Sequence, residues 1–535
     1  MQEASEPSLA ESIQPAPRTN WIPRAGLLMM LCAFAVFKSS HLDLPYYWDE
    51  AWVYAPAITA MHDEGVSLMP WAIPPELSRG HPLFFHAVGA VWMNLFGDSF
   101  TAMHALPLFL TLLLVVATYR LGALLTDEAT GFFAALLVCL SETVLAQSSL
   151  LLPEILLALL LVLSVTAYLQ RKPWIFMISF TAALWTKETA IVAFVALLIT
   201  HAWSFRDEHA WADRKAWRQW LLLIIAPVIV ASSYFIVQRW SLGWFLFPEH
   251  VGMITWSKED IAYKAREAFV MAFETEGVQW LTLTGTIAAP LLILRQRPVM
   301  APLAAFCFTA SIKILWGRWP VPSSLQLIAV AAAVATGIWL LARLARYQAP
   351  NTASPILLFG FCCVGLWAFS ALNFYTPRYL LPIHPFLVIG TLAALKSTVL
   401  GSRSWVVPAS SLAIAVVMMS SLGTDGHVGD TRLNYRDAIS VHRDRIQYCT
   451  EKNLHDAHIM ASFIDVHYMT HPESGYLQGS PVFTELATEL HTDTEYAFVD
   501  YQSRKELPDE LIAIGFKQVA RFRKGQAWGD IYWRE

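Results

Sequence analysis

Long apolar segments recur along most of the chain and are separated by short loops that carry most of its charges. A helix of about 20 apolar residues spans the hydrocarbon core of a bilayer. The pattern therefore predicts an α-helical polytopic membrane protein with about thirteen transmembrane helices. Their expected positions are 22–40, 101–119, 130–148, 155–169, 173–186, 189–204, 217–238, 279–294, 299–317, 324–342, 355–374, 379–396 and 405–422.

The basic residues of the short loops fall almost entirely on one side of these helices. That side holds Arg18, Arg24, Arg120, Arg171, Lys172, the segment 206–218, Arg295, Arg297, Arg343, Arg346, Lys396 and Arg403. Because loops rich in Lys and Arg stay in the cytoplasm, we expect a plasma (inner) membrane protein with a cytoplasmic N-terminal tail, 1–20. The segments 41–100, 240–278 and 423–535 and the loop near Glu154 then lie outside.

The first outer segment, 41–100, is too long for a simple connection and mixes aromatic residues with Pro, Gly, His and charges. We expect 50–64 and 82–97 to be helices at the outer membrane face. A crossing at 82–97 would reverse the side of every later loop and remove the agreement among the charges.

The chain changes character near Gly423, where charge rises and long apolar segments end. Short apolar stretches, 457–464 and 496–501, read as strands, and 432–448 and 507–514 have helical patterns. Such alternation predicts a small mixed α/β domain. The expected organisation is a tail over 1–20, a transmembrane domain over 21–422 and an outer α/β domain over 423–535.

Composition agrees with a lipid environment and excludes some functions. Charged residues make up 15% of the 535 residues, against about a quarter in a soluble domain. The net charge of −5 provides no basic face, so we expect no nucleic-acid partner. Only Cys449 lies in the polar tail, and the other five cysteines lie in apolar segments, so the spacing predicts neither a disulfide framework nor a zinc site.

Asp49 and Glu50 directly follow the first predicted transmembrane helix, within the aromatic sequence YYWDEAWVY. Adjacent carboxylates at a membrane boundary are costly unless they are paired, protonated or functional. A carboxylate beside an acceptor hydroxyl can act as a general base. The plainer alternative is a solvated loop or a helix N-cap.

Glu154 lies at the outer end of another predicted helix, in SSLLLPEILLALL. It could complement the dipole of that helix. It also falls on the same predicted membrane face as Asp49, which favours a shared site.

Basic residues occur on that face in SRGHPLFF, LWTKETAI and FYTPRYLLPIHPF, which contain Arg79, His81, Lys187 with Glu188, and Arg378. Each cation could bind a phosphate oxygen, and Arg can do so bidentately. Each could equally be an interfacial side chain that reaches toward water. Two acids, a Lys and two Arg on one face are harder to explain by interfacial placement alone.

In these residues the chain resembles the GT-C superfamily of integral-membrane glycosyltransferases. It is most similar to the branch of the protein O-mannosyltransferases, the aminoarabinose transferase of lipid A and the Rgt-type galacturonosyltransferases. The resemblance covers roughly residues 20–400 as an ordered series of motifs: Asp49–Glu50, Arg79 with His81–Pro82, Glu154, Thr186–Lys187, FLFPEHVG with Glu249 and His250, and PRYLLPIHPF with Arg378 and Tyr379.

The resemblance implies a polyprenyl-phosphate sugar as donor and a glycan, lipid A-type or protein acceptor at the outer face. Asp49 would be the general base of an inverting transfer, and Glu154 would orient the acceptor or help to bind a divalent metal. The lipid phosphate would contact Arg79, His81, Lys187 and Arg378.

The motifs differ from those of the aminoarabinose branch at three positions. Trp52 replaces an Arg, His81 replaces a Lys before Pro82, and Glu154 replaces an Asp. Three other functions stay open: a transporter or flippase of lipid-linked sugars, a glycan polymerase or ligase, and a binding scaffold. Transporters have internal repeats and charges near the bilayer midplane, whereas this chain shows no repeat and has its charges at helix ends.

Overall fold

The computed structural model describes most of the chain. The described residues are 21–204, 214–254, 257–275, 277–293, 353–373, 376–398, 401, 403–424 and 427–535. Two of the predicted transmembrane helices, 299–317 and 324–342, lie outside these residues.

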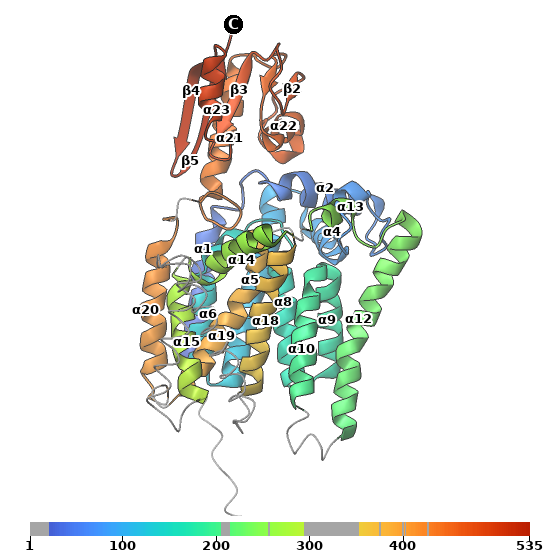
Figure 1. Ribbon diagram of the computed structural model, residues 1–535, viewed down its shortest axis with the longest axis vertical. Helices are drawn as coiled ribbons and strands as arrows, with labels where there is room; N and C mark the ends of the chain where they lie inside the picture. Colours follow the sequence, from blue (N-terminus) through green and yellow to red (C-terminus); the bar gives the residue numbers. More distant parts are fainter. Residues whose placement is uncertain are drawn as a thin grey trace, which may run out of the picture.

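Most described residues before 423 form a bundle of apolar helices that run side by side (Figure 1). The bundle contains α1 (Trp21–Ser39), α5 (Phe100–Leu125), α6 (Glu128–Cys139), α8 (Glu154–Leu169), α9 (Pro173–Thr186), α10 (Ile191–Ser204), α12 (Arg214–Leu242), α15 (Val278–Ile293), α18 (Ala353–Leu372), α19 (Ile383–Lys396) and α20 (Val406–Ser421). Among the described residues, four helical segments are long and apolar enough to cross a membrane: 21–39, 100–125, 214–242 and 377–396. The predicted helical, multi-pass class is confirmed.

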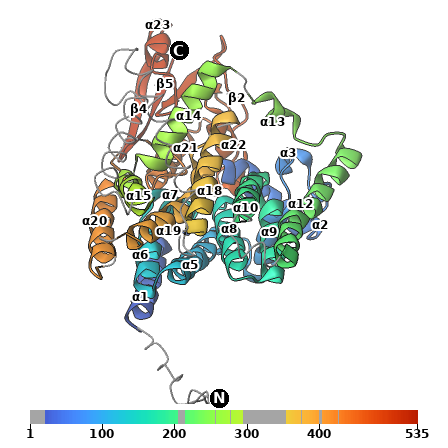
Figure 2. The ribbon, with the colours of Figure 1, turned by 60° about the horizontal axis from the view of Figure 1, so that its bottom comes forward.

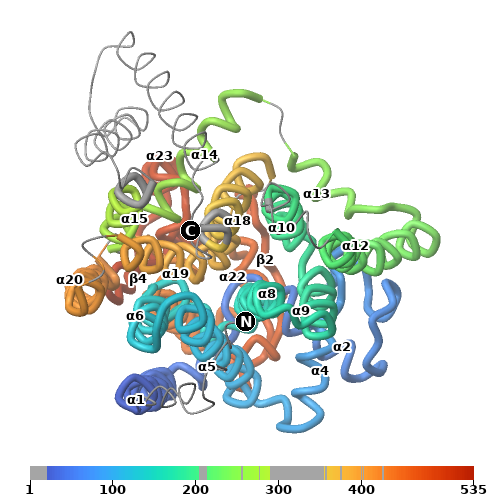
Figure 3. The backbone as a smooth tube through the Cα atoms, turned by 90° about the horizontal axis from the view of Figure 1, so that it is seen from below, coloured from blue at the N-terminus to red at the C-terminus, as the bar shows by residue number. Residues whose placement is uncertain are grey.

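Helix burial follows position in the bundle. In Figure 2 and Figure 3, α1, α12 and α20 lie at the rim, whereas α8 and α19 lie nearer the centre. In the 18-residue apolar window of the segment 377–396, 83% is buried, against 17% in the window of α1 and 28% in that of α12. The rim helices therefore present apolar faces where a bilayer would meet the protein.

The predicted single helix over 130–148 is wrong. The chain forms α6 and then a separate short helix, α7 (Glu142–Gln147), with Ser141 in an extended conformation between them. The buried Glu142 carboxylate accepts hydrogen bonds from the Gly423 and Leu433 backbone N–H groups. A buried carboxylate needs such partners, and they lie far away in the sequence.

Two pairs of residues from predicted cytoplasmic loops meet in the structure. Arg24 pairs with Glu128, and Lys396 pairs with Asp127 at 3.0 Å. The charge pattern assigned these loops to one side of the membrane, and the contacts show that they lie at the same end of the bundle.

The end of the bundle nearest the C-terminal domain is covered by short helices (Figure 1). They include α2 (Ala55–Glu64), α3 (Pro75–Ser78), α4 (Phe84–Phe96), α13 (Pro248–Gly252) and α14 (Lys258–Phe273). The helices expected at 50–64 and 82–97 are present, and a π-helical turn, Glu50–Tyr54, precedes α2. Sequence patterning did not identify α14, whose charged positions resemble a loop.

The C-terminal residues form a five-stranded sheet with order β2-β1-β3-β5-β4. Its elements are α21 (Tyr435–Glu451), β1 (Ile459–Met460), α22 (Phe463–Thr470), β2 (Leu486–Ala487), β3 (Tyr496–Asp500), α23 (Leu507–Ala513), β4 (Lys517–Lys524) and β5 (Ala527–Trp533). Strand β1 is parallel to β2 and β3, whereas β5 is antiparallel to β3 and β4. The mixed α/β prediction is confirmed, but most of the strand expected at 457–464 is wrong because Ser462 caps α22.

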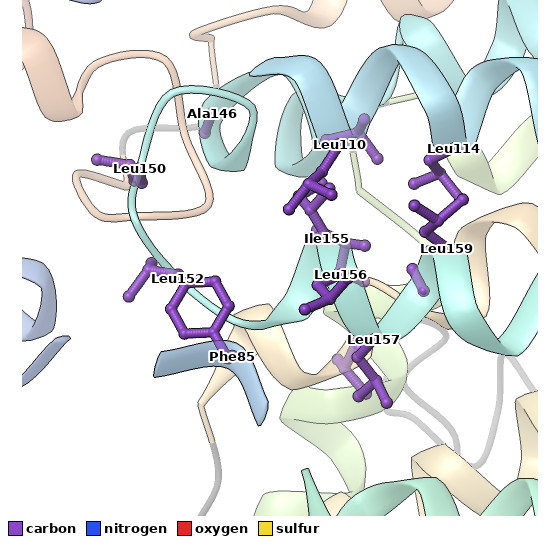
Figure 4. Packing of buried hydrophobic residues seen from close by; sticks show 14 of the residues in the cluster. Phe85, Leu110, Leu114, Ala146, Leu150, Leu152, Ile155, Leu156, Leu157 and Leu159 are labelled. Atoms are coloured by element: carbon purple, nitrogen blue, oxygen red, sulfur yellow. The ribbon is translucent and has the colours of Figure 1, made fainter. Parts of the chain in front are cut away.

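The start of α8 is fixed by a dense apolar core. Leu150, Leu152 and the first residues of α8 are buried, and this stretch lies beside Leu110 and Leu114 of α5 (Figure 4). A close-packed core has low compressibility and leaves its residues little freedom to move. The core therefore sets the position of Glu154, the first residue of α8.

Candidate active site

Arg378 is the centre of a buried ionic cluster. It lies in a 3₁₀ turn, Pro377–Leu380, and is 6% exposed. Its guanidinium donates to the Asp49 carboxylate and lies 2.5 Å from Asp430 Oδ2 and 3.3 Å from Glu154 Oε1. The planar fork of an Arg can serve several oxygens at once, and here it joins residues from three distant parts of the chain.

Lys187 completes this cluster. Its Nζ lies 2.6 Å from Glu154 Oε1 and 3.5 Å from the centroid of the Tyr379 ring. Helix α9 ends at Thr186 and Lys187 is extended, which lets the side chain leave the helix. Glu154 follows Pro153 at the N-terminus of α8, where the helix dipole favours a carboxylate.

The cluster contains more carboxylates than cations. Asp49, Glu154 and Asp430 face Lys187 and Arg378. Burial raises the pKa of Asp49, but Arg378 and the Trp52 indole outweigh it and hold that pKa below its usual value. Burial raises the pKa of Asp430, and the Asp49 and Glu154 carboxylates add to this increase, which Arg378 only partly offsets. Asp430 is therefore the carboxyl that gains a proton more readily than a free Asp.

A second cluster lies around the Arg79–His81 segment. Arg79 pairs with Glu249 at 2.7 Å, and His81 pairs with Glu188 at 2.9 Å. The His250 ring centroid lies 5.1 Å from that of His81. Arg79 and His81, which the resemblance assigned to the donor phosphate, thus pair with other carboxylates in the structure.

Two links connect the clusters. The Trp52 indole N–H donates to Asp49 at 3.0 Å, and the Arg79 guanidinium lies 5.0 Å from the Trp52 ring. Lys187 and Glu188 are consecutive, and each belongs to one cluster. The predicted residues therefore form one continuous polar region with two centres.

Glu50 has different surroundings from Asp49. Its fully buried carboxylate accepts the Tyr47 and Leu151 backbone N–H groups and contacts His104 Nε2 at 2.8 Å. A carboxylate with all these partners inside the protein fixes the backbone. We therefore infer a structural role for Glu50, the second carboxylate of the predicted Asp49–Glu50 pair.

An apolar groove of about 260 Å³ begins beside the second cluster. Glu188 is the charged residue of its lining, and the other lining residues are Leu184, Ile191, Val228, Ala231, Ser232, Phe235, Phe245, Leu246 and Phe369. Its walls come from α9, α10, α12 and α18. An apolar groove whose lining includes a charged residue suits an amphipathic ligand.

Sequence reasoning missed Asp430. This residue follows the last helix of the bundle, in GHVGDTRLN, and no apolar pattern surrounds it. Its backbone C=O accepts from Gln147 Nε2 at 2.8 Å, which brings the segment over the bundle. The signal available in the sequence was a carboxylate close to a membrane boundary.

The divalent metal that the sequence left open would take its ligands from Asp49, Glu154 and Asp430. These oxygen donors suit a hard cation. Arg378 already lies at salt-bridge distance from all three carboxylates. A metal ion would have to displace this guanidinium, so the three carboxylates as they stand do not fit a metal ion.

His442, Asp465 and Asp500 of the C-terminal domain also lie close enough together to share a metal ion. The Arg445 guanidinium donates to both aspartates at 2.9 and 3.2 Å. All four side chains are buried. The guanidinium supplies the positive charge at this position, so the group is a closed ionic network.

Residues 80–234 match the model of a family described as dolichyl-phosphate-mannose-protein mannosyltransferase. The matched stretch contains His81, Glu154, Lys187 and Glu188. Asp49 and Arg378 lie outside it and reach the same place through the fold. No protein with a curated description matches the chain.

Solved structures similar to the chain include ArnT from Cupriavidus metallidurans bound to undecaprenyl phosphate, with a TM-score of 0.49, 12% identity and coverage of 96% of this chain and 98% of that one. The apo oligosaccharyltransferase of Archaeoglobus fulgidus has a TM-score of 0.43 and 11% identity, with 90% and 70% coverage. The mycobacterial arabinofuranosyltransferase AftD has a TM-score of 0.39 and 14% identity, with 95% and 41% coverage.

The family match covers the middle of the motif series, from His81–Pro82 through Glu154 to Thr186–Lys187. Over residues 80–234 the chain is similar to the dolichyl-phosphate-mannose-protein mannosyltransferases, which confirms the resemblance to membrane glycosyltransferases that its motifs indicated.

Proposed function

We propose that this chain is a glycosyltransferase that moves a sugar from a polyprenyl-phosphate donor to an acceptor hydroxyl at the outer membrane face. One observation carries the proposal: Arg378 contacts Asp49 and Glu154 in a buried cluster that also contains Lys187. A base candidate and two phosphate-binding cations thus lie within one site. The mannosyltransferase match over 80–234 supports the same reaction class.

Lys187 and Arg378 bind the donor phosphate in this proposal. Both cations are almost fully buried, and charge-assisted bonds to phosphate are strong where water is excluded. The apolar groove reaches Glu188, the residue after Lys187. The isoprenoid chain lies in that groove, which places the phosphate near the two cations and the lipid within reach of the bilayer.

Asp49 is the general base. It accepts the proton of the acceptor hydroxyl as the hydroxyl oxygen attacks the anomeric carbon from the face opposite the phosphate. The bond from that carbon to the phosphate oxygen breaks, and its electron pair leaves with the polyprenyl phosphate. The configuration inverts, and Lys187 and Arg378 stabilise the charge on the departing phosphate.

Donor binding also prepares the base. Asp49 is a weak base while Arg378 contacts it, because the guanidinium holds its pKa below the usual value. A phosphate that takes over the guanidinium removes part of this effect and raises the pKa of Asp49. Glu154 keeps Lys187 in place and orients the acceptor. Arg79, His81, Glu249 and His250 form the second cluster, beside Glu188.

The sidedness of the chain is part of the proposal. The charge pattern places the N-terminus in the cytoplasm and the C-terminal domain outside. Asp49 and Asp430 both contact Arg378. Asp49 precedes α2 and Asp430 precedes α21, and these helices lie at the end of the bundle that carries the C-terminal domain (Figure 1). A glycan, a lipid A-type molecule or a protein is the acceptor class that the resemblance implies.

The test is a transfer assay with purified protein in lipid nanodiscs. The donors are radiolabelled undecaprenyl- and dolichyl-phosphate hexoses and pentoses, and the acceptors are lipid A, envelope glycans and Ser/Thr peptides. We expect product with one donor, and a loss of at least about 100-fold in Asp49→Asn. Asp63→Asn is the matched control, because Asp63 lies in the same outer segment and is 67% exposed.

Equal transfer by Asp49→Asn and Asp63→Asn would exclude Asp49 as the base. Movement of the labelled donor between leaflets without product would favour a flippase. Transfer of whole oligosaccharides in place of single sugars would favour a polymerase or ligase.

A further inference from the structure

The segment Tyr46–Trp52, which we call the Asp49 loop, lies between the bundle and the C-terminal domain. Glu50 fixes it from the bundle side through the Leu151 N–H and His104. We infer that the C-terminal domain fixes it from the other side and is a positioning element for Asp49, with Tyr468 of α22 as the key residue. This inference rests on the proposed role of Asp49.

Three hydrogen bonds join the backbone of the Asp49 loop to the C-terminal domain. The Trp48 N–H donates to the Tyr468 hydroxyl at 2.9 Å, and the Tyr46 N–H donates to the Ser474 carbonyl at 3.1 Å. His467 Nε2 lies 3.2 Å from the Ala51 carbonyl. These bonds lie on both sides of Asp49, so the domain constrains its backbone before and after the residue.

Aromatic contacts add to these bonds. The Trp52 and Phe463 rings meet edge to face with centroids 5.1 Å apart. The Tyr47 and Tyr501 hydroxyls lie 3.2 Å apart. Trp52 is also the residue whose indole donates to Asp49, so packing against α22 sets the direction of a direct partner of the Asp49 carboxylate. Figure 1 shows α22 on the side of the domain that faces α2.

The backbone at Trp48 needs such support. Its φ of +50° is in the left-handed region, which a bulky residue rarely adopts. A π-helical turn, Glu50–Tyr54, follows directly, and such turns often occur at functional sites. Strained backbone persists only where its surroundings determine it. The Tyr468 hydroxyl bonds to the N–H of the strained residue itself.

The chain supplies a matched control for Tyr468. Tyr476 stacks on Tyr468 with centroids 3.9 Å apart, and both side chains are buried. The Tyr476 hydroxyl interacts with that of Tyr468 and forms no hydrogen bond to the described residues of the Asp49 loop. Tyr468→Phe and Tyr476→Phe therefore remove the same atom from adjacent rings, but only the former removes a bond to the Asp49 loop.

The first measurement is amide hydrogen exchange of residues 46–52 in the full-length protein in nanodiscs. Loss of one hydrogen bond should speed exchange by about fivefold or more in Tyr468→Phe and leave it unchanged in Tyr476→Phe. The second is sugar transfer, in which kcat should fall about tenfold in Tyr468→Phe with the donor KM within about twofold. A role in fold stability alone would lower the amount of active protein and affect both tyrosine variants.

His467→Ala provides a second variant if Tyr468→Phe does not fold, with His471→Ala as its control, because the two rings stack at 4.0 Å. Only His467 contacts the Ala51 carbonyl, so only its variant should loosen the loop and lower kcat. Unchanged exchange in the Asp49 loop overturns the inference, and so does faster exchange with unchanged kcat. Exchange is measured without substrate, so it decides whether the domain holds the loop even if the wild-type protein shows no transfer and the proposed function fails.

Discussion

Asp430 Oδ2 lies 2.5 Å from a terminal nitrogen of Arg378, although 52 residues separate them in the sequence. Asp430 thus occupies one arm of the guanidinium that the proposed donor phosphate needs. An anionic donor and an ionised Asp430 therefore compete for the same guanidinium.

We expect donor binding to depend on pH through Asp430. Burial and the neighbouring carboxylates raise the pKa of this group, so it gains a proton at a higher pH than a free Asp. As pH falls through that raised pKa, Asp430 becomes neutral, its contact with Arg378 weakens and the donor KM decreases. Asp430→Asn should have a low donor KM that no longer varies with pH.

Kinetics over a pH range that begins at the ordinary pKa of an Asp and extends upward to neutral pH would check this expectation. The control is Asp444→Asn, because Asp444 is exposed. We expect this variant to keep the pH dependence of the donor KM that the wild-type protein shows. A donor KM that varies equally with pH in Asp430→Asn and in the wild type would contradict the assigned competition.

The pair of Glu154 and Lys187 should be costly to break. Their charged atoms lie 2.6 Å apart in a site with almost no exposure. Removal of one partner leaves a buried charge, which costs about 3–5 kcal/mol. We expect Glu154→Gln and Lys187→Met each to lower the thermal unfolding midpoint strongly, and the double variant to recover part of that loss without recovering transfer.

Thermal unfolding in detergent and double-mutant analysis would measure this coupling. Strictly additive effects of the two substitutions would show that the pair does not act as a unit.

Arg378→Lys keeps the positive charge but loses the planar fork that reaches three carboxylates. Because Lys has a single compact ammonium group, we expect transfer to fall on the order of 100-fold. The control is Arg504→Lys, since Arg504 forms an exposed pair with Glu510 in the C-terminal domain. Transfer rates of the two variants at saturating donor give the comparison, and similar rates would argue against a role for the fork.

We expect the ionic network of His442, Arg445, Asp465 and Asp500 to stabilise the C-terminal domain without a bound metal ion. Burial alone would raise the pKa of Asp465, but Arg445 and His442 hold it far below its usual range. Asp465→Asn should therefore destabilise the protein by about 3–5 kcal/mol. Treatment with a chelator should leave the unfolding midpoint unchanged. A midpoint that drops with chelator and recovers with Zn²⁺ would instead show a metal site at His442, Asp465 and Asp500.

Apolar periodicity predicted the bundle well because lipid-facing helices must satisfy their backbone internally. The bounds of α9 (Pro173–Thr186) equal the prediction, since Pro173 opens the helix and Thr186 precedes a buried charge. The break at Ser141 was missed because the partners of the adjacent Glu142, Gly423 and Leu433, are far away in the sequence and no local pattern connects them to it. In the C-terminal domain, the charged residues of β4 obscured a strand that pairs with β5.

The candidate site was partly readable from the sequence. Asp49, Glu154, Lys187 and Arg378 stood out as charges at helix ends, and the structure brings them together. Asp430 was missed because it lies beyond the last apolar helix, in a polar segment with no surrounding apolar pattern. Glu50 was not distinguished from Asp49, since their different partners arise only from the fold.

The most direct test of the account is a structure of the protein with bound undecaprenyl phosphate. We expect phosphate oxygens within hydrogen-bond distance of Arg378 and Lys187, the isoprenoid chain along the groove beside Phe235, and Asp430 released from Arg378. Phosphate bound elsewhere, with Arg378 still in contact with Asp49, Glu154 and Asp430, would contradict the account.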